Sequence, residues 1–242
     1  MNKNIKIFDT PDSLAQQLAI DLMQEINNSS KEFFLAISGG STPKILFKEL
    51  SYSPFKEKLN WSKVQIFWCD ERCVPPEDSD SNYGMTKSIL LDHVNIPPEN
   101  IHRIYGESHP EKEAVRYAKE IAKILPEEKN KLPRFDWVLL GLGTDGHTAS
   151  LFPNSELLYS CSNIAGVGIH PVTGQKRISL TEKVINNSKR ITFVVTGNDK
   201  ALILSDIINN NIGNRDIPAS KIKPTDGSIE WRLDTESAQY LK

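Results

Sequence analysis

Two side chains that can carry protons, Asp145 and His147, lie two positions apart in the stretch GLGTDGHT at residues 141–148. The charge of a histidine changes near neutral pH, which suits it to act as a general base. The glycines of the stretch let the backbone turn sharply and let another molecule come close to it. The stretch therefore predicts a catalytic turn, although a glycine turn with a functionless surface histidine has the same short pattern.

A second glycine turn, SGGSTP at residues 38–43, predicts a phosphate site. It follows an apolar run and precedes helical spacing, so backbone N–H groups and the positive end of a helix dipole face the turn. The hydroxyl groups of Ser41 and Thr42 add donors. The turn lacks the Gly-Lys-Ser/Thr ending of a P-loop and the third glycine of a dinucleotide fingerprint. Capping of the helix by Ser41 or Thr42 stays open and is compatible with phosphate binding.

Three charged residues, Asp70, Glu71 and Arg72, follow the apolar run at 64–69. Charges at the end of a buried strand are costly unless they are paired or used. In an open parallel sheet this end of a strand is where ligands bind. We expect Asp70 and Arg72 at the site, whereas an internal ion pair explains Glu71 nearly as well.

Two further cations follow in the second half of the chain. Arg177 begins an alternating stretch at 177–181, either as a surface charge or as a ligand for an anion. Lys200 lies in the first turn of an expected helix, after the glycine of GNDKA at 197–201. A cation there opposes the helix dipole unless an anion is near. Lys200 therefore favours a phosphate in its vicinity.

Apolar runs and amphipathic stretches alternate along the chain, which is the pattern of a parallel sheet covered by helices. The run WVLL at 137–140 has no polar residue, as in a strand buried on both faces. We expect strands at residues 5–8, 33–37, 64–69, 101–104, 137–140, 177–181 and 191–196, and around Trp231. We expect helices at residues 10–28, 43–50, 82–90, 110–125 and 201–207, with others beginning at Thr148 and at Thr235. The fold class is therefore α/β, with residues 1–242 as one domain containing a doubly wound, mostly parallel sheet and helices on both faces.

Two expectations concern what faces solvent. The charges of the helix at 110–125, Glu113 among them, are expected to form a solvated face. Its buried face is expected to carry Val115, Ala118, Ile121, Ala122 and Leu125. His102 and His109 have no partner motif and are expected at the surface.

Composition limits the function classes. Of 242 residues, 38% are hydrophobic and 25% charged, and 29 basic against 31 acidic residues leave no basic excess for nucleic acid. No apolar run approaches the roughly 20 residues of a membrane helix. Cys69, Cys73 and Cys161 are few for a disulfide framework, and the first two are interpreted as packed thiols rather than metal ligands. We expect a cytoplasmic protein with no metal and no nucleic-acid or membrane partner.

Five motifs, in this order over nearly the full chain, resemble the 6-phosphogluconolactonase family, which shares a superfamily with the glucosamine-6-phosphate deaminases and isomerases. They are SGGSTP at 38–43, DER at 70–72 with SNY at 81–83, GLGTDGHTASLFP at 141–153, RISLT at 177–181 and GNDKA at 197–201. The deaminase branch typically has Met-Asp-Glu-Tyr where this chain has CDER at 69–72. It also has a Phe-Asn-Glu-Pro type ending where this chain has SLFP at 150–153. Both differences favour the lactonase branch.

The resemblance implies hydrolysis of 6-phospho-D-glucono-1,5-lactone to 6-phosphogluconate, a step of the pentose phosphate pathway, with no cofactor. We expect His147 to activate the attacking water as general base and to return the proton to the ring oxygen. Asp145 either fixes the imidazole tautomer or binds a sugar hydroxyl. Arg72 is expected near the carbonyl or the phosphate, where it stabilises negative charge. Asp70 contacts sugar hydroxyls or orients Arg72.

The expected partner is this small phosphosugar lactone, and the chain is expected to be a monomer or a weak homo-oligomer. The expected substrate-binding residues are Gly39, Gly40, Ser41, Thr42, Asp70, Asn82, Gly146, Arg177 and Lys200, with Gly40, Ser41, Thr42, Arg177 and Lys200 at the phosphate. Two alternatives stay open. An aminosugar-phosphate isomerase or deaminase on the same scaffold would use Asp70 to move a carbon-bound proton. A non-catalytic sugar-phosphate-binding regulator would need a DNA-binding segment, for which the expected first strand leaves no room.

Overall fold

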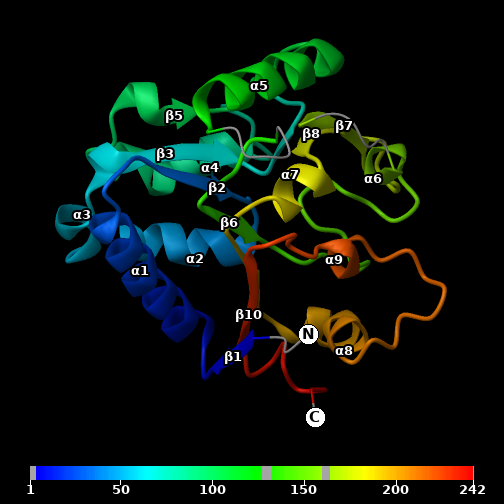
Figure 1. The fold of residues 1–242 in the computed structure, drawn as a ribbon. Coiled ribbons are helices and arrows are strands. Elements are labelled where there is room, and N and C mark those ends of the chain that lie inside the picture. Colours follow the sequence, from blue (N-terminus) through cyan, green and yellow to red (C-terminus); the bar gives the residue numbers. More distant parts are fainter. Residues whose placement is uncertain (1–3, 127–131, 160–163, 242) are drawn as a thin grey trace.

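Seven strands form one parallel sheet in the order β1-β10-β9-β6-β2-β3-β5 (Figure 1). The computed structural model describes residues 4–126, 132–159 and 164–241. The strands are β1 (Asn4–Phe8), β2 (Phe33–Ile37), β3 (Val64–Trp68), β5 (Ile101–His102), β6 (Trp137–Leu140), β9 (Arg190–Val195) and β10 (Ser228–Asp234). The central strands β2, β3 and β6 are buried along their whole length, as the apolar sequences of β2 and β6 predict, whereas β3 also buries the polar Gln65.

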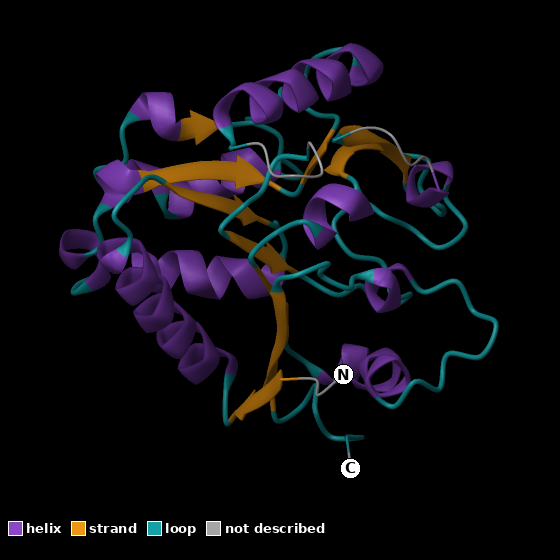
Figure 2. Ribbon diagram, viewed as in Figure 1, coloured by secondary structure: helices purple, strands orange, loops and turns teal. Residues whose placement is uncertain are grey.

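Helices cover both faces of this sheet (Figure 2). They are α1 (Pro11–Asn28), α2 (Ser41–Leu50), α3 (Phe55–Lys58), α4 (Asn82–Ile89), α5 (Pro110–Ile124), α6 (Glu156–Tyr159), α7 (Glu182–Asn186), α8 (Ala201–Ile208) and α9 (Pro218–Lys221). In β3, Ile66 lines a small internal cavity together with side chains of α1 and α2. The ring of the next residue, Phe67, lies 6.4 Å from that of Tyr117 in α5. Because successive strand residues point to opposite faces, α1 and α2 cover one face and α5 the other. Among the described helices, none is long and apolar enough to span a membrane.

A second, antiparallel sheet lies beside the main one and was not expected from the sequence. Its order is β4-β8-β7, with β4 at Asp70–Arg72, β8 at Lys176–Leu180 and β7 at Ala165–Ile169. The sequence predicts only β8, because β4 is a short charged stretch and glycines weaken β7 as a strand candidate. One of the glycines of β7, Gly168, is required, since a Cβ there would come within 2.5 Å of the Ser150 carbonyl oxygen. This small sheet holds Asp70, Arg72 and Arg177.

Two expected helices are turns in the structure. Ser150 lies in a tight turn in which its N–H donates to Ser179 Oγ at 3.1 Å, and Ala149 has a φ of 48°. Residues 235–240 form successive turns, with the N–H of Ser237 bonded to Asp234 Oδ1 at 2.8 Å. The positive φ of Ala149 is incompatible with a right-handed helix. The bond to Asp234 is an N-cap contact, but only turns follow it.

The buried face of α5 also differs from the expected one. Its core residues are Ala114, Tyr117 and Ile121. Val115 is 54% exposed, whereas Glu113 is only 2% exposed. The Glu113 carboxylate accepts the N–H of Tyr105 at 2.8 Å and pairs with Arg116 at 2.6 Å. A charge with this many donors can be buried, so the assumption that every charged residue of α5 faces solvent was wrong.

His102 is buried rather than at the surface, whereas His109 is exposed as expected. The Nε2 atom of His102 lies 2.7 Å from Gln65 Oε1, and its Nδ1 lies 3.1 Å from Glu120 Oε1. Its ring stacks on Phe67 with centroids 4.4 Å apart. These partners come from β3 and α5, so no local motif reveals them.

Candidate active site

The site lies where the strand order of the main sheet reverses. β2 and β6 are neighbours, but the chain continues from β2 to β3 on one side and from β6 to β9 on the other. The turns that leave such neighbouring strands diverge and open a crevice for ligands. Here those turns are the two glycine stretches, and they line a cavity of about 160 Å³.

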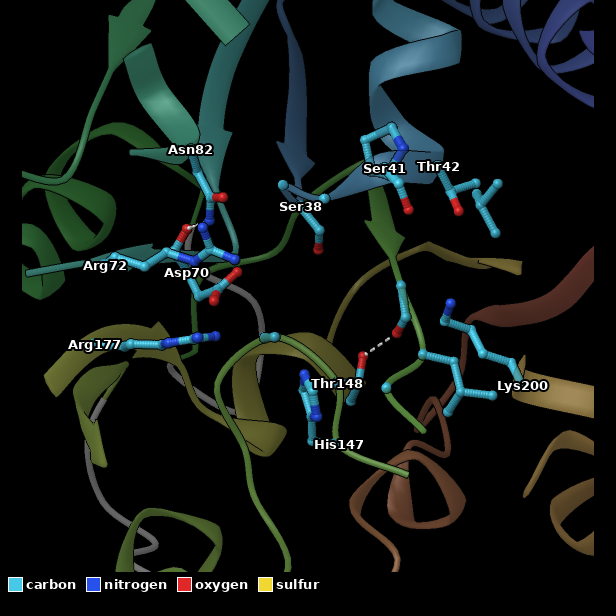
Figure 3. A pocket seen from close by; sticks show the side chains of 18 residues that line it. Ser38, Ser41, Thr42, Asp70, Arg72, Asn82, His147, Thr148, Arg177 and Lys200 are labelled. Atoms are coloured by element: carbon cyan, nitrogen blue, oxygen red, sulfur yellow. Dashed lines mark hydrogen bonds between the residues drawn. The ribbon is translucent and has the colours of Figure 1, made fainter. Parts of the chain in front are cut away.

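The cavity collects most of the side chains that the sequence singles out (Figure 3). It is lined by Ser38, Gly39, Gly40, Ser41, Thr42, Pro43, Asp70, Arg72, Asn82, Gly141, Leu142, Gly143, His147, Thr148, Ala149, Arg177, Val194 and Lys200. Two expected residues, Asp145 and Gly146, are not among those lining it. In Figure 3, Arg72 and Arg177 lie on one side, Ser41, Thr42 and Lys200 on the other, and His147 below and between them.

Glycines make room for the His147 ring. The backbone folds back between Gly143 and His147, with the Gly143 N–H donating to the His147 carbonyl at 2.9 Å. A Cβ at Gly143 would lie 2.1 Å from His147 Nδ1. Gly146 has a φ of 84°, and a Cβ there would come within 2.5 Å of Ile217. Gly146 therefore shapes the turn rather than lining the cavity.

The carboxylate of Asp145 orients this ring. Its Oδ1 atom lies 2.6 Å from His147 Nδ1 and also accepts the His147 backbone N–H at 3.0 Å. Burial raises the pKa of Asp145, but hydrogen bonding and charge attraction from His147 outweigh it, so this pKa is lowered overall. A carboxylate at Nδ1 holds the proton there. The lone pair of the neutral ring is then on Nε2, the atom that a general base needs.

The arginine side of the cavity is held by β4 and β8. Arg72 and Arg177 are register partners in this antiparallel pair, so two positive charges face each other. Within the described residues neither guanidinium forms an ion pair, and Arg72 Nε is buried without a hydrogen-bond partner. Burial and the charge of Arg72 lower the pKa of Arg177. Like charges opposite one another destabilise a sheet, so this pair is arranged for an anion.

Asp70 is the first residue of β4 and lines the cavity on the same strand as Arg72. It is 5% exposed, and its Oδ2 accepts a hydrogen bond from Ser150 Oγ at 2.6 Å. The amide of Asn82 donates to the Asp70 carbonyl at 2.9 Å. A Cβ at Gly39 would overlap Asn82 Oδ1 at 1.8 Å, so glycine is required for this contact. The structure thus gives Gly39 and Asn82 a packing role at the cavity wall.

The opposite side is the N-terminus of α2. The N-cap residue is Gly40, at φ 111°, and no side chain in the described structure caps the helix. The hydroxyl of Thr42 instead lies 2.7 Å from that of Thr196. Capping by Ser41 or Thr42 is therefore not observed, and the first N–H groups of α2 face the cavity unpaired by a side chain. Lys200 Nζ, 3.0 Å from Asp199, faces the same space.

Glu71 belongs to the structure of the wall. It is 2% exposed and accepts the backbone N–H groups of Arg72, Asn82 and Tyr83 at 2.7–2.8 Å. Its carboxylate therefore stabilises the start of α4, and among the residues that the structure describes it forms no ion pair of the kind considered from the sequence. Burial raises the pKa of Glu71 despite these donors.

Neither described cysteine lines the cavity. Cys69 is buried and Cys73 is half-buried, and both are free thiols. Burial raises the pKa of Cys73 to about 11. Cys161 lies outside the described residues. Over residues 4–126, 132–159 and 164–241, no group of three or more His, Cys, Asp or Glu side chains is arranged to hold a metal ion.

Several contributors were missed from the sequence. Ser150 was assigned to a helix start but supports Asp70. Ser38 and Thr148 line the cavity, and Thr148 Oγ1 donates to the Gly141 carbonyl at 2.9 Å. All three lie inside the recognised motifs, so the motif boundaries were the available signal.

Comparison with known proteins covers almost the whole chain. The family model for glucosamine-6-phosphate isomerases/6-phosphogluconolactonase matches residues 9–231. The 6-phosphogluconolactonase of Haemophilus influenzae is 44% identical over 230 residues, which are 95% of this chain and 94% of that protein. A crystal structure of a devB protein matches with a TM-score of 0.94 at 42% identity over 99% of both chains. The 6-phosphogluconolactonase of Trypanosoma brucei matches with a TM-score of 0.88 at 28% identity, over 100% of this chain and 99% of its own.

Proposed function

The chain belongs to the glucosamine-6-phosphate isomerase/6-phosphogluconolactonase family, and on that premise we propose that it hydrolyses 6-phospho-D-glucono-1,5-lactone to 6-phospho-D-gluconate. The reaction is a step of the pentose phosphate pathway. The observation that carries the proposal is the position of His147, oriented by Asp145 beside a cavity with cations on two sides. A lactone with a phosphate at its far end needs both a base and these anchors.

The hydrolysis follows from the orientation of the imidazole. His147 Nε2 takes a proton from water as the water oxygen attacks the lactone carbonyl carbon. The tetrahedral intermediate then collapses, the bond between this carbon and the ring oxygen breaks, and the imidazolium returns its proton to the ring oxygen. Asp145 keeps the ring oriented and stabilises the imidazolium formed between the two steps.

Each cationic side of the cavity is assigned to a different anionic group of the substrate. Arg177 lies with Arg72, across the cavity from Lys200, and not beside it as the sequence interpretation assumed (Figure 3). We assign the phosphate to the N–H groups of α2, to Ser41 and Thr42, and to Lys200, because a helix N-terminus with a nearby cation suits a dianion. The arginine pair then stabilises the oxyanion and the product carboxylate beside His147.

Asp70 serves this arrangement as a buried acceptor. Its carboxylate accepts a hydrogen bond from Ser150 Oγ. It also lies close enough to raise the pKa of Arg177, although burial lowers this pKa more strongly. It therefore orients the arginine side and does not take a proton from the substrate. We further propose that residues 1–242 act as one domain, as a monomer or weak homo-oligomer, in the cytoplasm.

The test compares two substrates on the native protein. Freshly made 6-phosphogluconolactone is hydrolysed with the spontaneous rate subtracted, and glucosamine-6-phosphate is incubated in parallel with an assay for ammonia. Acceleration of the lactone reaction without ammonia release is expected. Ammonia release without lactone hydrolysis would contradict the proposal and make Asp70 the base of an aminosugar-phosphate deaminase.

A further inference from the structure

A hydrogen-bonded bridge joins two loops beside the arginine side of the cavity. The side chain of Gln175 uses both of its polar atoms there. Its Nε2 donates to Asp80 Oδ2 at 3.0 Å, and its Oε1 accepts from Arg177 Nε at 3.2 Å. We call this contact between Asp80 and Gln175 the Asp80–Gln175 bridge.

The same bridge reaches the second arginine. Arg72 Nη1 donates to the backbone carbonyl of Asp80 at 2.6 Å. Both guanidinium groups are therefore attached to one structure, Arg177 through Gln175 and Arg72 through Asp80. Neither forms an ion pair in the described part of the chain, so these neutral acceptors, together with the Phe152 ring 5.6 Å from the Arg177 guanidinium, fix their direction.

The loops that supply the bridge are themselves ordered by local bonds. Gln175 closes a turn in which the His170 N–H donates to the Gln175 carbonyl at 3.0 Å and Gly174 donates back to His170 at 2.9 Å. On the other loop, the Asp80 N–H donates to Asp78 Oδ1 at 2.8 Å. The two loops are far apart in sequence and meet only beside the site.

The Asp80–Gln175 bridge holds two flexible side chains of like charge in place. Arg72 and Arg177 repel one another and have long, flexible side chains, so fixing both toward the cavity costs conformational entropy. A donor array that is fixed before the reaction stabilises developing charge better than one that must reorganise. An acceptor placed on Nε or on one Nη leaves the remaining N–H groups of each guanidinium for a ligand.

We propose that Gln175 and Asp80 are positioning residues that preorganise the arginine pair for the developing oxyanion. The inference rests on the proposed lactonase function. Gln175 acts through Arg177. Asp80 acts on Arg72 by its backbone carbonyl and on Gln175 by its carboxylate. Neither residue lines the cavity, so an effect on turnover has to pass through the arginines.

The test uses steady-state hydrolysis of 6-phosphogluconolactone by the native protein, Gln175→Ala, Asp80→Ala and the double variant. Gln175→Ala removes one hydrogen bond to a charged group, so it is expected to lower kcat/KM about tenfold, mainly through kcat. The melting temperature is expected to stay unchanged. Asp80→Asn, which keeps a side-chain acceptor for Gln175, is expected to stay near the native rate. Asp80→Ala keeps the backbone carbonyl that holds Arg72, so it is expected to lose no more than Gln175→Ala. The double variant is expected to lose little more than Gln175→Ala, because coupled residues are not additive.

The matched control is Val172→Ala, which lies in the same turn and is 86% exposed. If the native protein is active and Gln175→Ala matches Val172→Ala, the positioning role is overturned while the lactonase function stands. Fully additive losses in the double variant also overturn the bridge. If the native protein does not exceed the spontaneous rate, the proposed function fails and the inference fails with it.

Discussion

Two pairs of arginines in this molecule have opposite surroundings. Arg232 is fully buried between α1 and the sheet, where it bonds to Glu230 at 3.0 Å and pairs with Asp21. Arg190 joins the same cluster, 2.8 Å from Glu230. In the part of the chain that the structure describes, Arg72 and Arg177 face each other without an ion pair.

The difference separates structural charge from charge kept for a ligand. Burying an arginine is tolerable when carboxylates pair with it, as Glu230 and Asp21 do with Arg232. The arginine pair at the cavity wall has only the nearby charge of Asp70, with no ion pair among the described residues, so solvent or an anion has to balance the rest of its charge. The contrast predicts that removing one kind of arginine harms stability and removing the other harms turnover.

The largest effect on the fold is expected from Arg232→Met. It leaves Glu230 and Asp21 without their buried partner, which typically costs about 3–5 kcal/mol. Urea denaturation should show this loss in the free energy of unfolding, while kcat/KM per folded molecule stays at the native value. A variant with native stability would remove the basis of the comparison.

Arg177→Ala is expected to lower turnover and not stability. It should lower kcat/KM about 10- to 100-fold, the size expected for a hydrogen bond to a charged group, and leave the free energy of unfolding unchanged or slightly raised, because a like-charge contact disappears. Steady-state kinetics and urea denaturation measure the two quantities. Lys176→Ala, on the same strand but paired with Glu111 at the surface, is the control and should change neither by much. Equal losses of activity in both variants would contradict a ligand role for Arg177.

A smaller effect is expected on the free energy of unfolding at acid pH. Burial raises the pKa of Glu230, but Arg232 and Arg190 together with Thr192 lower it overall below its ordinary value of 4.5. Its contribution to stability is therefore complete above about pH 4.5 and is lost as the pH falls through the lowered value. Urea titrations below pH 5 should show a shallower loss of stability with falling pH in Glu230→Gln than in the native protein. Parallel curves would show that the buried cluster does not govern acid unfolding.

The parts of the site that the sequence predicted are the local ones. The glycine turns with His147 and Ser41 follow apolar strands directly, so their positions at the carboxyl ends of β6 and β2 follow from the parallel sheet. The pairing of Arg72 with Arg177 depends on a strand pair between distant segments, which periodicity cannot reveal. For this reason Arg177 was grouped with Lys200.

Two residues that were wrongly expected at the surface are also held by contacts with other parts of the chain. Glu113 was expected in solvent because it is charged, and His102 because it has no partner motif. Each is buried by partners from another element, such as Tyr105 for the carboxylate and Gln65 for the imidazole. Side-chain burial was predictable where an apolar run is unbroken, as in β6. It was not predictable for Val115, an apolar residue that is exposed, or where burial depends on satisfied polar contacts.

The most direct measurement of the catalytic account is lactone hydrolysis by His147→Ala. The native protein, His147→Ala and the surface control His109→Ala are compared on fresh 6-phosphogluconolactone, with circular dichroism to show that each is folded. A general base contributes roughly 10²–10⁴-fold, so His147→Ala should lose at least 10²-fold in kcat while His109→Ala keeps the native rate. A folded His147→Ala with native turnover would contradict the account and place the base elsewhere in the cavity.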